Sequence, residues 1–153
     1  MAALTAIRDT RTKVGKQPGM RDVALKSGYK VYAGAIVTIH TANGYGRPAF
    51  SGANQVAMGV AQKTVDNSST GTLPGANTDG GLSVPVKSGA VFGPFANDEA
   101  PYAVAVAHRG QVCYLLDDQT VSTNSSSHSV AGIVDDVDSE GVWVEIDPIA
   151  RQS

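Results

Sequence analysis

Hydrophobic and polar residues alternate along most of the chain in short stretches, and Gly, Pro, Asn or Asp separates one stretch from the next. The segments "GAIVTIHT", "QVAMGVAQKTV" and "LSVPVKSGAVFGPF" are of this kind. No segment has apolar residues at the i, i+3, i+4, i+7 spacing of an amphipathic helix. The pattern therefore predicts an all-β fold, either a small β-barrel or a β-sandwich.

Turn residues divide this pattern into hairpins. Asn43-Gly44 follows "GAIVTIHT" and predicts a tight hairpin, because both residues accept a positive φ. The segment "PYAVAVAHRGQVCYLL" predicts a strand, a turn at Arg109-Gly110 and a second strand. Pro85 and Pro94 are expected at sheet edges or strand ends, because proline donates no ladder hydrogen bond. Residues 66–80 have no apolar period and predict a long loop.

The chain also contains one hairpin pattern twice. Gly59-Val60-Ala61 aligns with Gly132-Ile133-Val134, and residues 81–86 align with residues 141–146. Strand alternation then predicts six core residues: Leu82, Val84, Val86, Val142, Val144 and Ile146. The alternative is a chance similarity between short strands of an all-β chain.

A chain of 153 residues suffices for one core, and residues 29–153 are expected to form a single β-rich domain. Residues 1–28 show neither the helical nor the strand period of apolar residues, which predicts an extended N-terminal arm. Half of the 12 Lys and Arg residues lie in the first 26 positions, whereas ten of the 14 Asp and Glu residues lie from Asp98 onward. The two ends are therefore expected to meet differently charged surfaces, or each other on neighbouring copies.

The arm's cations are the main candidate binding residues: Arg8, Arg11, Lys13, Lys16 and Arg21. We expect them to contact an acidic protein surface, with the arm becoming ordered on contact. Nucleic acid is the less favoured partner, because the arm has no aromatic residue for base stacking and the protein is slightly acidic. A solvated tail is the remaining alternative.

Motifs for catalysis are missing from the sequence. It contains no G-x-S-x-G elbow, phosphate-binding loop or H-E-x-x-H helix, so neither an enzyme nor a cofactor is expected. His40, His108 and His128 are isolated, and no ligand spacing joins them to Cys113 in a metal site. Cys113, the single cysteine, lies in the apolar run "QVCYLL" and is expected to be a buried thiol.

The acidic segment "DDVDSEG", residues 135–141, is the closest approach to a calcium-binding pattern. Its glycine is misplaced for an EF-hand loop, however. A solvated hairpin turn, whose acids discourage pairing with stray strands, is favoured over an ion site.

The order of these segments resembles that of the capsid decoration, or cement, proteins of tailed bacteriophages. The resemblance covers residues 33–148 and depends on "AGAIVTIH", a "GVA" strand, "GLSVPVKSGAVFGPF", "VCYLLDD" and "VAGIVDDVDSEGVWVEIDP". It implies a non-enzymatic, β-tulip-like protein that binds the major capsid protein on the outer capsid surface and stabilises the DNA-filled head. It also implies a homo-oligomer, with a trimer favoured over a dimer.

Two other functions stay open from the sequence. A phage tail or fibre component would also be an all-β homo-oligomer, and a non-catalytic binding module is a further alternative. The five tyrosines are scattered rather than clustered, which disfavours a carbohydrate-binding module. No apolar run is long enough to span a membrane, and we expect synthesis in a bacterial cytoplasm and residence in the virion.

Overall fold

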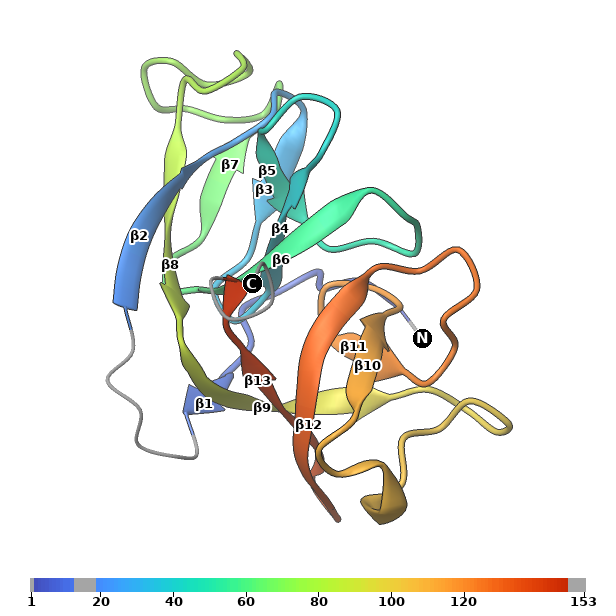
Figure 1. Cartoon of the computed structure of the whole chain (residues 1–153). Coiled ribbons are helices and arrows are strands. Elements are labelled where there is room, and N and C mark those ends of the chain that lie inside the picture. Colours follow the sequence, from blue (N-terminus) through green and yellow to red (C-terminus); the bar gives the residue numbers. More distant parts are fainter. Residues whose placement is uncertain (1, 13–18, 149–153) are drawn as a thin grey trace.

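The structure is a computed structural model that describes residues 2–12 and 19–148 (Figure 1). The fold class is all-β, as predicted. One short 3₁₀ helix, η1, spans Val106–His108. The strands, in chain order, are β1 Arg11–Thr12, β2 Gly19–Ala24, β3 Tyr29–Val31, β4 Ile36–His40, β5 Gly46–Pro48, β6 Gln55–Ala61, β7 Val65–Asn67, β8 Ser83–Ser88, β9 Ala90–Asn97, β10 Val112–Leu115, β11 Thr120–Ser122, β12 Val130–Asp138 and β13 Gly141–Ile146.

The C-terminal half forms a closed five-stranded barrel, called here the second barrel. Its strands follow the order β9-β11-β10-β12-β13, and β13 pairs with β9 to close the ring. All neighbours are antiparallel except β11 and β9, which run parallel. Closure removes the exposed sheet edges that would otherwise attract stray strands.

The N-terminal half repeats this topology and is called here the first barrel. Its sheet has the order β2-β8-β6-β4-β5, with antiparallel neighbours. A parallel bridge between Leu25 and Gly46 joins the two outer strands, at the place where β9 and β11 run parallel in the second barrel. The chain is thus a tandem pair of small barrels with one topology, joined where β8 runs into β9 (Figure 1).

The predicted repeat of two paired strands is confirmed, since β6 pairs with β8 as β12 pairs with β13. The predicted alignment of residues 81–86 with residues 141–146 is wrong by two positions, because Lys87 faces Val60 where Glu145 faces Ile133. Five of the six predicted core residues are buried, and Leu82 is partly buried against the cluster that contains Val84 and Val86. Gly59 in β6 and Gly132 in β12 occupy equivalent places. A Cβ at either would collide with the carbonyl oxygen of the facing strand, that of Lys87 or that of Glu145.

The two copies differ in their connections. β12 and β13 are joined by a tight turn, whereas the chain between β6 and β8 forms β7 and a loop of residues 68–82, so the loop predicted at residues 66–80 begins two residues later than expected. β7 pairs with β3 in a separate two-stranded sheet. The buried Asn67 carboxamide organises the loop: its Nδ2 donates to the carbonyls of Leu25 and Thr78, and its Oδ1 accepts from Asn77 N–H.

Two hydrophobic clusters fill the barrels, and the strands β4 and β6 contribute to both. Val37 and Ala61 point into the first barrel, whereas Ile36 and Val60 belong to the cluster of the second barrel. Because both faces of β4 and β6 are buried, the two barrels share a wall and form one packed body.

The segment expected to be an extended arm is partly built into the sheets. β1 pairs with β9, and β2 pairs with β8 along its whole length. Residues 2–10 form a strap that crosses the seam between the barrels, as the contacts below show. The border expected at residue 28 therefore does not separate a free arm from a barrel.

The expectation for the prolines was wrong. Pro85 lies inside β8, opposite Asp22, and is tolerated because the β6 ladder ends at Val86. Pro94 lies inside β9, where Gly93 and Pro94 together face the single residue Trp143 in a β-bulge.

The strand expected in "PYAVAVAH" is also absent from the described structure, where this segment is a loop that ends in η1. The Asn97 carboxamide bonds both main-chain groups of Val104, at 2.7 and 2.8 Å. His108 Nδ1 accepts the Ala105 N–H at 2.8 Å. These side chains satisfy backbone groups that a strand would have offered to a ladder. The hairpin predicted at Asn43-Gly44 is confirmed by the pairing of β4 and β5.

Candidate functional site

The strap of residues 2–10 ties the two barrels together. Leu4 N–H donates to Asp118 Oδ1 at 2.7 Å, and Gln119 Nε2 donates to Ala2 O at 2.7 Å, both in the second barrel. Arg8 N–H donates to Ala33 O at 2.9 Å, in the first barrel. The strap therefore contacts both sides of the seam, and Leu4 also packs against the core of the first barrel.

Asp118 is the most perturbed carboxyl group at this seam. It is 2% exposed. Burial raises its pKa from 3.8 to about 6, while the Leu4 N–H and the Arg8 charge act in the opposite direction. The neighbouring Asp117 adds a further upward shift to this pKa. The strap is thus anchored on a carboxylate whose charge is poorly solvated.

Arg8 is held by its own protein. Its Nη2 donates to Pro94 O and its Nη1 to Thr10 Oγ1, and the guanidinium lies 5.5 Å from the Phe95 ring centroid. Burial lowers its pKa from the ordinary value, although nearby carboxylates oppose this. The side chain therefore fixes the strap to the second barrel.

The other proposed arm cations lie in different settings. Arg11 forms an exposed ion pair with Glu140 at 3.0 Å, and its guanidinium lies 5.4 Å from the Trp143 ring. Arg21 is half-buried in β2. Lys13 and Lys16 lie outside the described residues. The structure thus places none of the three described cations on a free arm.

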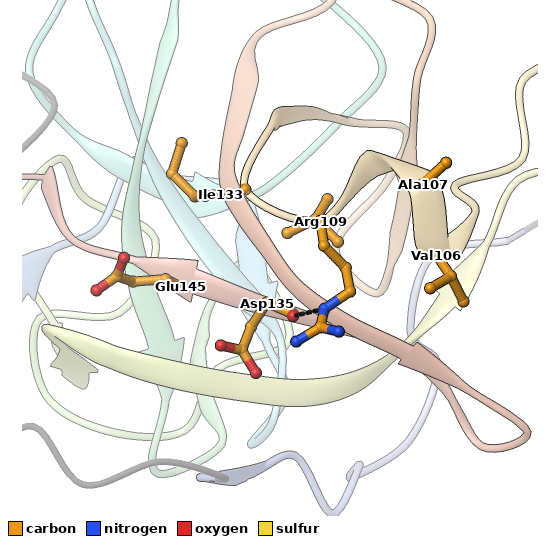
Figure 2. Close-up of a pocket in the computed structure, with 8 residues that line it drawn as sticks. Val106, Ala107, Arg109, Ile133, Asp135 and Glu145 are labelled. Atoms are coloured by element: carbon orange, nitrogen blue, oxygen red, sulfur yellow. Dashed lines mark hydrogen bonds between the residues drawn. The ribbon is translucent and has the colours of Figure 1, made fainter.

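A hollow of about 610 Å³ opens on the second barrel, between the η1 turn and the β12–β13 hairpin (Figure 2). We call it the hairpin hollow. Its apolar lining comes from Val106, Ala107 and Ile133, and Asp135 and Glu145 provide carboxylates. Arg109 Nε donates to Asp135 O at 3.0 Å, as the dashed line in Figure 2 shows. The hollow combines apolar surface with negative charge.

A second hollow of about 520 Å³, the loop hollow, lies at the start of β12. It is lined by several apolar side chains and by His128, Asn54 and Gln55. Beside it, His128 Nε2 lies 3.0 Å from Ser51 Oγ, and Nδ1 lies 2.6 Å from Ser126 O. Because a carbonyl only accepts, Nδ1 carries a proton, and in the neutral ring Nε2 accepts from the Ser51 hydroxyl.

This hydrogen-bond order is the one that activates a serine nucleophile. The third group is a main-chain carbonyl rather than a carboxylate, however, and Ser51 is exposed outside the hollow. Ser129 N–H also donates to Gly52 O at 3.1 Å in the same place. The Ser51–His128 pair therefore joins the loop after β5 to the loop before β12 across the seam.

The other candidate residues from the sequence either form hydrogen bonds with residues close to them in the chain or are buried. His40 Nδ1 accepts the Ala42 N–H at 3.1 Å, and Cys113 is buried as predicted. In the acidic turn, Asp138 accepts main-chain N–H groups of Glu140 and Gly141 and the indole N–H of Trp143. Within residues 2–12 and 19–148, no group of three or more His, Cys, Asp and Glu side chains is arranged to hold a metal ion.

Sequence reasoning missed Asp118 and the strap. "LLDD" ends an apolar run and is typical of a turn, so nothing local indicates that both acids are buried. One sequence feature could have suggested the burial of these acids: the pair directly follows that apolar run in the sequence.

Comparison of the chain with protein-family models, curated proteins and solved structures finds no match. In the part of the chain that the structure describes, no helix is long and apolar enough to cross a membrane.

Proposed function

We propose that this chain is a structural, non-enzymatic capsid decoration protein of a tailed bacteriophage, which binds the major capsid protein on the outside of the head. The observation that carries the proposal is that both barrels are filled by side chains. Phe92, Phe95 and Leu115 fill the second barrel and Leu25 and Val31 the first, each at most 1% exposed. A small barrel filled in this way offers its outer surface for binding rather than an internal chamber.

The packing of the chain supports the same function. The strap and the shared wall join two barrels into one body, so force applied to one barrel is transmitted to the other through a continuous core. Many copies on a lattice would give multivalent attachment, in which modest contacts suffice. The order of strand motifs in the sequence, which resembles the decoration proteins, points to the same role.

The arm hypothesis is narrowed by the contacts of Arg8 and Arg11. Both already have partners within the chain, so we propose that Lys13 and Lys16 contribute most of the basic charge offered to an acidic capsid patch. Removing the first 20 residues would be a poor test, because it would also remove the strap and β1. Reversal of the charge at Lys13 and Lys16 is the sharper experiment.

Heads prepared with and without the chain, imaged by electron cryo-microscopy, test the function. We expect regular density on the outer surface only when the chain is present, and greater resistance of the filled head to heat. Density on the tail instead would favour a tail or fibre component. A head surface that is identical in both preparations would refute the proposal.

The arm is tested on the same heads. The Lys13→Glu, Lys16→Glu double variant should reduce occupancy while its unfolding temperature stays unchanged. Lys63→Glu, an exposed cation of the first barrel, is the matched control. Full occupancy of the double variant would end the arm hypothesis and leave the decoration function in place.

A further inference from the structure

The wall formed by β4 and β6 in the first barrel has an equivalent in the second barrel, formed by β10 and β12. The residue pairs correspond one by one. In each wall the register shifts once, so that Met58 of β6 and Ala131 of β12 are left out of the pairing. The outward-facing pairs are Ile36 with Val60 and Thr38 with Ala57 in the first barrel, and Val112 with Ile133 and Tyr114 with Val130 in the second.

In the first barrel this wall is covered. Ile36, Ala57 and Val60 are at most 1% exposed, because they pack in one cluster with residues of the second barrel. The chain therefore shows what this face of the repeat packs against, namely another barrel of the same topology. Repeats commonly bury such faces against their neighbours.

In the second barrel the equivalent wall is open. Val112 is 39% exposed, and Tyr114, Val130 and Ile133 are half-buried. We call these four residues the open wall. Exposed apolar surface of this kind, hollowed and bordered by charge, marks interaction sites.

Both hollows described above border the open wall. Ile133 lines the hairpin hollow beside Asp135 and Glu145, and Val112 and Val130 line the loop hollow. The wall therefore lies between two depressions that side chains of a docked surface could enter.

Charge identifies the complementary surface. Residues 19–89, which hold the strands of the first barrel, carry six Lys and Arg against three Asp and Glu, whereas residues 90–153 carry two against ten. Two open walls placed face to face would bring their acidic borders together, and like charges across an interface are costly. The basic half of a second copy has the opposite charge.

We propose that the open wall is a docking surface for a second copy of this chain, which sits with its basic first barrel on the wall. The contact is heterologous: each copy offers its acidic half to one neighbour and its basic half to the other. Such a contact closes into a ring when the rotation between copies permits. The proposal goes beyond capsid binding and holds for the protein free in solution.

Light-scattering mass measurement of the full chain across a dilution series tests the proposal. We expect a mass that is a multiple of 15.7 kDa, falling toward 15.7 kDa as salt rises from about 0.05 M to about 0.5 M. Val112→Asp should weaken self-association by about 100-fold, and Val112→Lys should weaken it further because the docked surface is basic. Tyr102→Asp is the control, since Tyr102 is 45% exposed on the second barrel outside the wall.

Thermal unfolding of each variant must match the wild type at high salt, where all are expected to be monomeric. Ile133→Ser provides a second, milder change in the wall. A monomeric wild-type protein at high concentration would overturn the proposal, as would wild-type association of the Val112 and Ile133 variants. If Val112→Asp weakened self-association more than Val112→Lys, the surface docked on the open wall would not be the basic half of a second copy. If the protein decorated heads but was monomeric in solution, docking of a second copy on the open wall would be refuted, and the proposed function would stand.

Discussion

Gly59 and Gly132 occupy the same position in the two barrels, each pressed against a main-chain carbonyl of the facing strand. Gly59 has φ +145°, and Gly132 lies in the strand of the C-terminal hairpin. The closeness of the strands at these two points explains why the sequence motif that starts with glycine appears twice.

Substitution of Gly132 by alanine should therefore destabilise the protein by about 2 kcal/mol, because the added Cβ collides with Glu145 O and Val144. Urea unfolding measures the change. Gly19→Ala is the matched control, since a Cβ there meets nothing within 4 Å. Equal stability of the two variants would show that the strands separate at no cost.

The buried carboxyl of Asp118 makes stability depend on pH. Its folded pKa of about 6 lies above the ordinary value of 3.8. The stabilising contribution of the bound proton is therefore complete below about pH 4 and is lost as the pH rises through 6. Asp118→Asn keeps an acceptor for Leu4 N–H and removes the charge. It should stabilise the protein at pH 8 by about 2 to 3 kcal/mol.

Unfolding curves at pH 4 and pH 8 check this prediction, and the advantage of Asp118→Asn should vanish at the lower pH. Glu99→Gln, a change at an exposed carboxylate, should leave stability nearly unchanged at both values. A benefit of Asp118→Asn that does not vary with pH would show that the charge of Asp118 is not its cause.

Asn67 should be the residue on which the order of the following loop, residues 68–82, depends. Replacement by alanine leaves the Leu25 and Thr78 carbonyls and the Asn77 N–H without their side-chain partner, and should cost about 3 kcal/mol. Limited proteolysis should then cut the loop, which the wild type protects. Gln62→Ala, at an exposed amide, is the control. An uncut loop in the Asn67 variant would mean that other contacts order it.

Arg8 and Arg11 are predicted to differ in their effect on stability. Arg8→Ala removes the bond to Pro94 O and the contact with Phe95, so it should lower the free energy of unfolding by about 2 kcal/mol. Arg11→Ala breaks an exposed ion pair and should cost less than about 1 kcal/mol. Equal losses in chemical unfolding would contradict the assignment of Arg8 to the strap.

The local elements could be predicted from the sequence, because strand alternation and turn residues act over a few positions. The hairpin at Asn43-Gly44, the C-terminal hairpin and the burial of Cys113 all follow from such patterns. The strand expected before Arg109 is not formed, because the side chain of Asn97, which is 7 positions before Val104, bonds the backbone groups of Val104.

The strap and the closure of the barrels were decided by the tertiary structure alone. Leu4 and Asp118 are 114 positions apart, and no local pattern links a backbone N–H to a carboxylate at that distance. The equivalence of Val60 and Ile133 was visible in the sequence as a repeated motif. Their different burial was not, because it depends on which barrel packs against which wall. Alternation specifies which face of a strand is apolar, whereas the partner of that face is set by how distant segments pack.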